Sequence, residues 1–423
     1  MKTEDLYNVF LNCNKVCTDT RKIEEGDLFF ALKGDHFDGN AYAEEALKKG
    51  AGYAVIDNPQ YSVKNTILVG NVLHTLQQLA NYHRKQLTIP VVALTGSNGK
   101  TTTKELFNAV LSQKYNTTAT IGNLNNHIGV PLTLLSMNKD TELGIVEMGA
   151  NHLEEIGFLC NIAEPDYGYI TNFGKAHLEG FGGMEGVIKG KSELYNYLIS
   201  GNKTIFYNAN DSKQSDLLKS YQNTYSFGDT SNCDVIISLT SHNPFVSVDF
   251  EKLQIQTNLI GKYNFPNIAA AITIGTYFKI APEAIQKALA SYTPSNNRSQ
   301  IIRKGNNKVV LDAYNANPSS MSLALESFSQ MDDKNKIAIL GDMFELGHES
   351  ATEHQHIAEL ALKKKLQGLY LVGNNFFSTN SSSKKFKTFE DLKEYLMANK
   401  PENSSILIKG SRGMALERIL EFL

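Results

Sequence analysis

The residues best placed to do chemistry lie in a glycine-rich segment, TGSNGKTTTK, that follows Leu94. Gly96 and Gly99 allow the main chain to approach a phosphate group closely. Lys100 supplies a positive charge for the β- and γ-phosphates, and Thr101 offers a hydroxyl group to magnesium. Only GxxGKT of the general GxxxxGK(S/T) pattern is present, because Leu94 occupies the first glycine position. The segment indicates a phosphate-binding loop, and an ordinary strand-to-helix turn is the alternative.

This segment lies between a predicted strand and a predicted helix. Residues 90–95, PVVALT, form a short apolar run without polar alternation, which is typical of a parallel strand buried on both faces. From Thr101 onward the apolar residues recur with a helical period. This order directs the first N–H groups of the helix at the turn, where the helix dipole favours an anion. The sequence therefore predicts that nucleotide is bound by Gly96, Ser97, Asn98, Gly99, Lys100, Thr101 and Thr102.

Two more residues capable of chemistry follow other predicted strands. Glu147 is the single acid in the apolar run 143–148, where a carboxylate needs a cation such as the magnesium ion of a triphosphate. His177 lies in a glycine-rich loop after the predicted strand 167–171. Ligands bind outside the carboxyl ends of strands in open α/β sheets, so we expect Glu147 and His177 to converge on the phosphate loop. A structural or solvated role is the alternative for a lone histidine.

The composition restricts the class of protein. The chain has 423 residues, enough for about three domains, and its 41 basic and 44 acidic residues give a net charge of -3. This balance shows no electrostatic footprint for nucleic acid. The amino terminus lacks a leader-peptide pattern and no run of 18 apolar residues occurs, so we expect a cytoplasmic protein without a membrane span. The four cysteines show no CxxC pairing, so neither a disulfide framework nor a zinc site is expected.

The predicted elements are of mixed α/β type and fall into three units, residues 1–86, 87–296 and 297–423. The last unit alternates short apolar strands with helical patterns, the final helix being expected at 414–423. Such alternation implies βαβ crossovers and a largely parallel sheet. In the middle unit the period changes to two over 234–259, as in antiparallel strands. The helix predicted after it carries Asn264 and Asn267, which either cap the helix or touch a base.

Ten segments, in this order and covering nearly the whole chain, resemble the bacterial Mur ligases: TGSNGKTTTK, GNLNNHIGVPLTLL, VEMGAN, NFGKAHLEGFGG, KGKSELY, GKYNFPNIAAA, NRSQ, DAYNANPSSM, LGDMFELG and KGSRG. GNLNNHIGVP, KAHLEGFGG and DAYNANPSSM are most similar to the member that joins D-alanyl-D-alanine to UDP-N-acetylmuramoyl-tripeptide. The resemblance implies an ATP-dependent amide ligase of cell-wall precursor synthesis. It also implies a small N-terminal α/β substrate domain, a central P-loop-type ATPase domain with a mostly parallel sheet, and a C-terminal Rossmann-like α/β domain.

The resemblance also implies roles for individual residues. Lys100, Lys191 and His177 are expected to be catalytic, with Lys191 carbamylated and sharing a second magnesium ion with His177. Magnesium is expected at Thr101, Glu147, His177 and Lys191, and ATP also at Asn264, Asn267, Arg298 and Asp312, with Arg298 near the phosphates and Asp312 near the ribose. The substrates are expected at Asp19, Arg21, Lys33, Asp38, Asn125, Asn126, Asn315 and Asn317. The family pattern DGH ends in histidine where this chain has Asn40.

Two alternatives stay open beside this function. One is a sibling ligase with the same chemistry, such as folylpolyglutamate synthase or the diaminopimelate-adding enzyme, which differs in the amine that it accepts. The other is a P-loop nucleotide-binding regulator that performs no ligation and leaves Glu147, His177 and Lys191 without a role. A monomer is the default oligomeric state.

Overall fold

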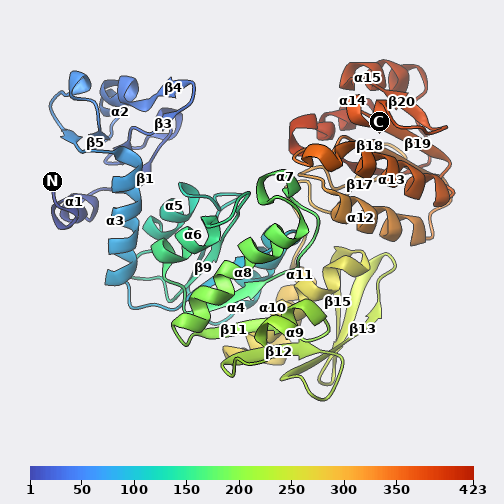
Figure 1. Cartoon of the computed structure of the whole chain (residues 1–423), viewed down its shortest axis with the longest axis horizontal. Helices are drawn as coiled ribbons and strands as arrows, with labels where there is room; N and C mark the ends of the chain where they lie inside the picture. Colours follow the sequence, from blue (N-terminus) through green and yellow to red (C-terminus); the bar gives the residue numbers. More distant parts are fainter.

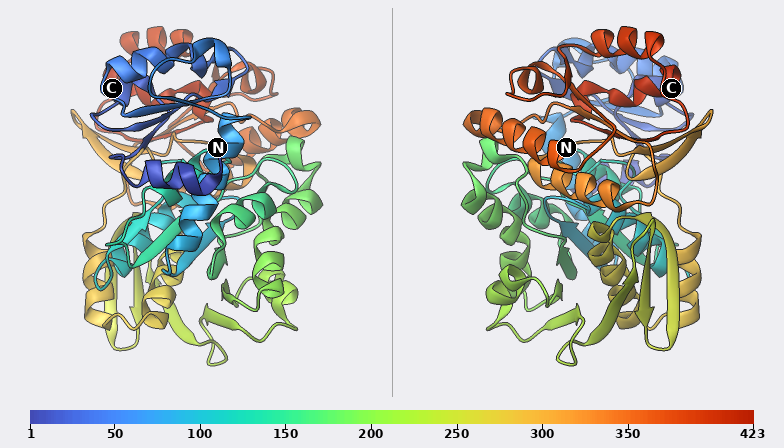
Figure 2. Two further views of the ribbon diagram at one scale, coloured as in Figure 1. Left: turned by 90° about the vertical axis from the view of Figure 1, so that its left-hand side faces the viewer. Right: turned by 90° about the vertical axis from the view of Figure 1, so that its right-hand side faces the viewer.

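Three β-sheets follow one another along the chain in the computed structural model, which describes residues 1–423. Figure 1 shows the three corresponding units, from blue through green and yellow to red. In the side views of Figure 2 the first and last units both lie above the central one. The mixed α/β class with three domains is therefore confirmed, whereas the boundaries at 86/87 and 296/297 stay predictions. None of the helices is both long and apolar enough to cross a membrane.

The first unit is a small parallel sheet of order β1-β2-β5-β6 with a separate hairpin of β3 and β4. Its strands are β1 (Val16–Cys17), β2 (Leu28–Phe30), β3 (Lys33–Gly34), β4 (Phe37–Asp38), β5 (Tyr53–Ile56) and β6 (Thr66–Leu68). Its helices are α1 (Thr3–Phe10), α2 (Ala43–Lys48) and α3 (Val72–Gln86), with 3₁₀ turns at Thr20–Lys22, Gly39–Tyr42 and Pro59–Tyr61.

The central unit contains a nine-stranded sheet of order β15-β14-β13-β12-β11-β10-β7-β9-β8, parallel except where β14 pairs with β13 and β15. Its strands are β7 (Val91–Thr95), β8 (Thr117–Ala119), β9 (Leu143–Glu147), β10 (Tyr167–Ile170), β11 (Thr204–Asn208), β12 (Thr224–Gly228), β13 (Val235–Ser241), β14 (Phe245–Phe250) and β15 (Leu253–Ile260). Its helices are α4 (Lys100–Leu111), α5 (Gly129–Leu135), α6 (Glu155–Ala163), α7 (Leu178–Phe181), α8 (Met184–Ser200), α9 (Ser212–Leu218), α10 (Phe265–Tyr277) and α11 (Pro282–Ser291), with a 3₁₀ turn at Lys262–Asn264.

The third unit has a six-stranded sheet of order β16-β17-β21-β18-β19-β20, parallel except for β16. Its strands are β16 (Gln300–Lys304), β17 (Asn307–Leu311), β18 (Lys336–Gly341), β19 (Gly368–Val372), β20 (Lys384–Phe386) and β21 (Ser405–Lys409). Its helices are α12 (Pro318–Gln330), α13 (Ser350–Lys363), α14 (Asn374–Phe377) and α15 (Phe389–Ala398), with 3₁₀ helices at Gly347–Glu349, Arg412–Met414 and Leu416–Phe422.

The helix predicted at 414–423 is therefore wrong in type, because the chain end is 3₁₀-helical. Ala415 adopts a left-handed conformation with φ +46°, which interrupts any continuous α-helix. Leu416, Ile419 and Phe422 then pack against the third sheet. Their spacing of three residues matches the three-residue turn of a 3₁₀ helix, which aligns them on one side.

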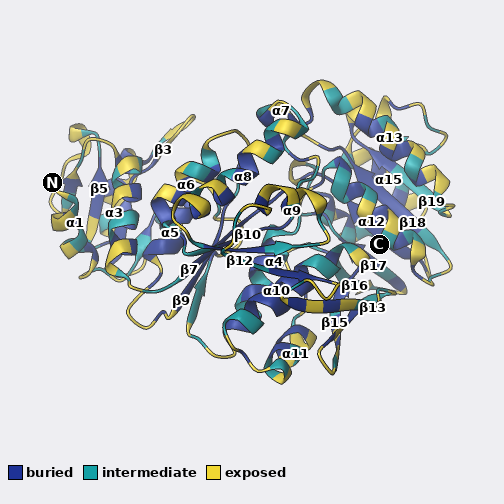
Figure 3. Ribbon diagram, turned by 60° about the horizontal axis from the view of Figure 1, so that its bottom comes forward, coloured by how far each residue is buried: buried dark blue, intermediate teal, exposed yellow.

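Strand β7 lies at the centre of the middle sheet and is buried on both faces, as its sequence predicts. Val92 and Leu94 pack on the side that contains α4 and α10, whereas Val91 and Ala93 belong to the core shared with α5, α6 and α8. Figure 3 shows inner strands of the central and third sheets, such as β7 and β18, as buried, with exposed residues on the outer faces of the helices. Because β9 and β10 flank β7 on opposite sides, the strand order reverses there, and ligands bind at such switch points.

Arg84 attaches α3, which follows the first sheet, to the central unit. Its guanidinium donates to the carbonyl oxygens of Ala163, Leu87 and Glu164, and it pairs with the Asp166 carboxylate at 2.8 Å. Arg84 is only 8% exposed, so these oxygens would lose their partner in a dry environment without it.

We expect Arg84→Met to lower the free energy of unfolding by about 3 kcal/mol, because it leaves partly buried acceptors without a donor. Lys85→Met is the matched control, since Lys85 is exposed and its pair with Glu164 is at the surface, so its effect should stay within about 0.5 kcal/mol. Denaturant titration followed by circular dichroism measures both values. Equal losses in the two variants would contradict the anchoring role of Arg84.

Candidate active site

The turn between β7 and α4 has a shape that only glycine fits at two positions. Gly96 has φ +139°, and a β-carbon there would lie 2.0 Å from Thr171 Oγ1. Gly99 has φ +80° and is the residue before the first turn of α4. The two glycines therefore let the chain fold tightly against the end of β10 and then enter the helix.

The start of α4 presents a set of unpaired donors. The main-chain N–H groups of residues 99–102 donate to no main-chain carbonyl, while those of Ser97 and Asn98 are bonded to Asn172. The ammonium group of Lys100 lies over the same turn, 2.7 Å from the Gly96 carbonyl oxygen. Desolvation lowers the pKa of Lys100, opposed by the Glu147 carboxylate and reinforced by Arg298. Free N–H groups at a helix start beside a lysine form an anion-binding site.

Glu147 supplies a negative charge directly beside this anion site. The residue is 1% exposed, and its Oε1 accepts hydrogen bonds from Thr101 Oγ1 at 3.2 Å and from Asn125 Nδ2 at 2.8 Å. Its other oxygen, Oε2, is buried and has no hydrogen-bond donor. A buried carboxylate oxygen without a donor is costly, and a cation held between Thr101 and Glu147 would satisfy it. The residues present therefore fit a magnesium ion.

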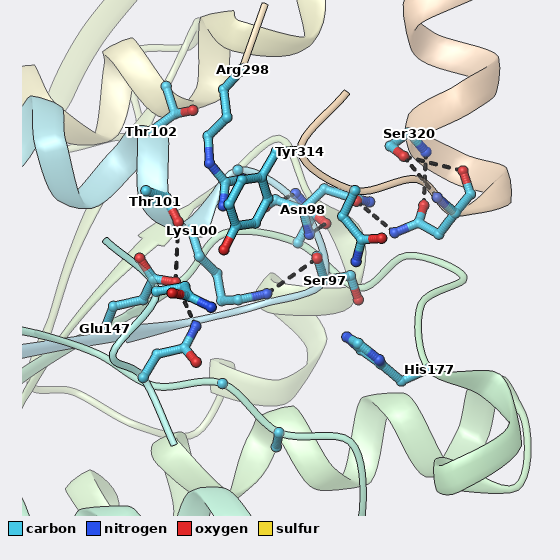
Figure 4. A pocket seen from close by; sticks show the side chains of 18 of the residues that line it. Ser97, Asn98, Lys100, Thr101, Thr102, Glu147, His177, Arg298, Tyr314 and Ser320 are labelled. Atoms are coloured by element: carbon cyan, nitrogen blue, oxygen red, sulfur yellow. Dashed lines mark hydrogen bonds between the residues drawn. The ribbon is translucent and has the colours of Figure 1, made fainter. Parts of the chain in front are cut away.

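These groups open into a cavity of about 500 Å³ between the central and third units. Figure 4 shows Lys100, Thr101, Glu147 and His177 around it, with Arg298 and Tyr314 entering from the other side. The predicted residues that line the cavity are Ser97, Asn98, Gly99, Lys100, Thr101, Thr102, Asn125, Asn126, Glu147, His177, Asn264, Asn267, Arg298, Asp312, Asn315 and Asn317. The convergence expected from the strand ends is thus present in the structure.

The third unit contributes a cationic and aromatic wall. The guanidinium of Arg298 lies 3.7 Å from the centre of the Tyr314 ring, a stacking that holds both side chains at the cavity. Asp312 accepts a bond from Lys409 Nζ at 2.6 Å and another from the Ser299 N–H at 3.0 Å. Lys409 is 2% exposed and was not predicted, although its place at the end of a strand in KGSRG was a usable signal.

His177 lines the cavity at the start of α7, in a left-handed conformation with φ +53°. Its Nδ1 faces the carboxylate of Glu345, a residue of the third unit. The hydrogen bond from His177 lowers the pKa of Glu345. Glu345 was missed in the sequence because nothing in LGDMFELG marks this acid as a contact of a histidine 168 residues earlier.

Lys191 lies behind the cavity wall and does not line the cavity. The side chain is fully buried in α8, and Nζ donates to the Ala150 carbonyl oxygen at 2.9 Å, while Ala150 itself lines the cavity. The ammonium also lies 4.8 Å from the centre of the Phe181 ring. Burial lowers the pKa of Lys191 well below its ordinary value, and the charge of Lys100 adds to this. Burial therefore shifts the protonation equilibrium of this lysine toward the uncharged amine.

Four of the predicted asparagines that line the cavity are already bonded within the protein. Asn126 accepts from the N–H groups of Ile128 and Gly129 before α5. Asn267 accepts from Thr103 Oγ1 and donates to Asn264, which in turn donates to the Ile260 carbonyl oxygen. Asn125 donates to Glu147. These contacts fix the cavity wall, and the ligand roles of these residues stay predictions.

The residues predicted in the first unit lie away from this cavity. Asp19 and Arg21 form an exposed pair at 2.8 Å, and Lys33 pairs with Asp57 at 2.8 Å. Asp38 accepts hydrogen bonds from Asn40, which is fully buried and also donates to Asp57. Asn40 therefore holds the ends of β4 and β5 together. A substrate role for Asp19, Arg21, Lys33 and Asp38 stays a prediction.

No group of three or more His, Cys, Asp and Glu side chains lies close enough to hold a metal ion.

Comparisons with known proteins show the family to which the chain belongs. Residues 13–92 match the Mur ligase family, catalytic domain, residues 94–275 the Mur ligase middle domain, and residues 297–412 the Mur ligase, glutamate ligase domain. The UDP-N-acetylmuramoyl-tripeptide--D-alanyl-D-alanine ligase of Bacillus subtilis (strain 168) is 35% identical over 96% of this chain and 92% of its own length.

Two solved structures are also similar. MurF from Acinetobacter baumannii has a TM-score of 0.87 and 29% identity, over 99% of this chain and 98% of its own. MurF ligase from Thermotoga maritima in complex with ADP has a TM-score of 0.85 and 27% identity, over 98% of this chain and 97% of its own. The resemblance that the sequence motifs indicated is confirmed, and the chain belongs to the Mur ligase family.

Proposed function

We propose that this chain is an ATP-dependent ligase that joins D-alanyl-D-alanine to UDP-N-acetylmuramoyl-tripeptide in peptidoglycan precursor synthesis. The observation that carries the proposal is one cavity in which a phosphate loop and a buried carboxylate face side chains of a separate third unit. The near-full-length similarity to ligases of this name supports the choice of substrates.

The first step activates the carboxylate of the tripeptide. One of its oxygens attacks the γ-phosphorus of ATP, the bond to the β-phosphate oxygen breaks, and ADP leaves an acyl phosphate behind. Such a transfer needs positioning and charge neutralisation more than covalent help from the protein. We assign these tasks to the free N–H groups of residues 99–102, to the Lys100 ammonium and to Arg298, which all face the cavity.

Magnesium is the cofactor that fits the unpaired Glu147 oxygen. Thr101 and Glu147 would hold it, while His177, at the same cavity, would belong to the second ion expected beside carbamylated Lys191. When bound, the ion supplies positive charge to the β- and γ-phosphates. Asn125 then keeps the Glu147 carboxylate oriented through its hydrogen bond at 2.8 Å.

The second step forms the amide. The neutral amino group of D-alanyl-D-alanine attacks the acyl carbon, and the tetrahedral intermediate expels inorganic phosphate and a proton. Water would hydrolyse the acyl phosphate, so the site must exclude it. The third unit already closes one side of the cavity with Arg298 and Tyr314, while Asn315 and Asn317 are candidates for contacts to the incoming dipeptide.

We assign the UDP-sugar to the first unit, at Asp19, Arg21, Lys33 and Asp38. The ion pairs of Arg21 and Lys33 are exposed at their basic ends, so both cations are accessible to a pyrophosphate. In this proposal Asn264 and Asn267 contact the nucleotide, and Asp312 contacts its ribose. The protein works in the cytoplasm as a monomer. The same cavity would serve a sibling ligase of different amine specificity.

Carbamylation of Lys191 belongs to the proposal as well. The neutral amine attacks carbon dioxide, a nitrogen–carbon bond forms, and one proton is released, which converts the uncharged amine into a carbamate that carries a negative charge. The enclosed position of Lys191, whose pKa burial lowers well below normal, favours this reaction. The new carboxylate would extend toward Ala150 at the cavity wall.

Release of ADP should require both UDP-N-acetylmuramoyl-tripeptide and D-alanyl-D-alanine. A coupled ADP assay with a panel of amines, including diaminopimelate, D-alanine and glutamate, measures this dependence. We expect the dipeptide to give the highest rate by far. Faster turnover with diaminopimelate or glutamate would assign the chain to a sibling ligase activity. If the protein binds nucleotide but no amine causes ADP release, the hypothesis of a non-catalytic nucleotide-binding regulator would remain.

Glu147→Gln should lower kcat by about a hundredfold and raise the magnesium concentration needed for half-maximal rate, because the amide carries no charge for the ion. Magnesium titration of the ADP assay measures both effects. Glu142→Gln is the control, since Glu142 is an exposed acid before the same strand that bonds only to Asn116. A parent-like magnesium requirement in Glu147→Gln would remove Glu147 from the metal site.

Lys191→Ala should lose about 99% of the activity while still binding ATP, because the phosphate loop does not depend on this side chain. Carbon-13 NMR of the parent in labelled bicarbonate should show a carbamate signal that Lys191→Ala lacks. Lys189→Ala, at a neighbouring position that is exposed, should keep both the signal and the activity. Full activity in Lys191→Ala, or a carbamate signal that survives the substitution, would contradict this assignment.

A further inference from the structure

Asn98 is the residue of the phosphate loop that touches the third unit. Its Oδ1 accepts a hydrogen bond of 2.8 Å from Asn317 Nδ2, across 219 positions of sequence. Both residues line the cavity. Figure 4 shows Asn98 beside the start of the helix that carries Ser320, with hydrogen bonds joining the two sides.

The orientation of this bond follows from the neighbouring contacts. Asn317 caps α12, and its Oδ1 accepts from the Ser320 N–H at 2.9 Å. A main-chain N–H can only donate, so the oxygen of Asn317 faces Ser320 and its NH₂ group faces Asn98. Asn98 must then present its own oxygen to Asn317. The contact therefore has one fixed direction.

The main chain of Asn98 is held just as firmly from the other side. Its N–H donates to Asn172 Oδ1 at 3.1 Å, and its carbonyl oxygen accepts from Thr171 Oγ1 at 2.6 Å and from Asn172 Nδ2 at 3.0 Å. Ser97 adds a bond from its hydroxyl to the Gly174 carbonyl oxygen at 2.9 Å. The loop after β10 thus fixes the first half of the phosphate loop.

The same loop after β10 also contacts the third unit. The N–H of Lys175 donates to Ser319 Oγ at 2.9 Å, and its ammonium pairs with Glu353. A β-carbon on Gly174 would lie 2.9 Å from Asn98 Nδ2 and 3.2 Å from Ser319 Oγ, so three segments meet there without spare room. Docking of the third unit and the shape of the phosphate loop therefore depend on the same small junction.

We propose that Asn98 and Asn317 form a positioning pair that transmits the docking of the third unit to the phosphate loop. The side chains act through the loop and the cavity wall rather than on the reacting atoms. Docking fixes Asn98, and the free N–H groups that follow it at residues 99–102 are then held in the arrangement that binds the nucleotide phosphates. This inference rests on the proposed nucleotide site and adds a residue pair that couples it to closure.

The test is a double-mutant cycle on nucleotide affinity. Asn317→Ser keeps a good helix cap but is too short to reach Asn98, and Asn98→Ala keeps the main-chain bonds of the loop. Each variant should weaken binding of a non-hydrolysable ATP analogue with magnesium by about fivefold, the effect of one lost hydrogen bond. The double variant should be no weaker than either single one, because the shared contact is lost only once.

Glu353→Gln provides the matched control, because it weakens a contact between the same two units that does not involve the side chain of Asn98. When Glu353→Gln is combined with Asn98→Ala, the two fold-changes in affinity should multiply. Titration calorimetry measures the nucleotide affinity of each variant. Parent-like affinity in Asn317→Ser, or effects of Asn98→Ala and Asn317→Ser that multiply, would overturn the pair. The experiment measures nucleotide affinity only. If the unsubstituted protein binds nucleotide but forms no amide, the proposed reaction is refuted, whereas the test of the Asn98–Asn317 pair remains valid.

Discussion

The constraint on which the rest of the structure depends is the set of unpaired N–H groups at the start of α4, a geometry suited to an anion. Those groups exist because Gly96 and Gly99 turn the chain sharply between a fully buried strand and a helix. The strand order reverses at β7, so the turn faces an open crevice rather than a neighbouring crossover. The sheet, its helices and the adjacent loops all serve to hold this turn in place.

Side chains of opposite charge lie around this turn. Lys100 and Arg298 bring positive charge to the cavity, and Glu147 brings a buried negative charge with one oxygen left without a donor. Such an arrangement is costly for the protein alone, because buried charges need partners. A triphosphate with its metal ion would supply both partners at once. Lys191 lies behind the cavity wall near the same charges, and burial lowers its pKa well below the ordinary value.

The third unit completes the site through several polar contacts. Glu345 faces His177, Glu353 pairs with Lys175, and Asn317 bonds to Asn98. Interfaces between domains that contain such polar contacts allow relative motion of the domains. A ligase with an acyl phosphate intermediate needs both states, open for exchange of substrates and closed against water.

The sequence by itself determined the fold class and the phosphate loop, because periodicity and glycine placement act over a few residues. The sequence did not predict the type of short elements. The chain end is 3₁₀-helical because Leu416, Ile419 and Phe422 pack on the third sheet, which other segments of the chain form. Only the tertiary structure decided that Lys409 holds Asp312, that Asn40 is internal and that Asn98 meets Asn317. Such contacts join residues far apart in the chain, and local sequence patterns do not specify which distant residue will form the contact.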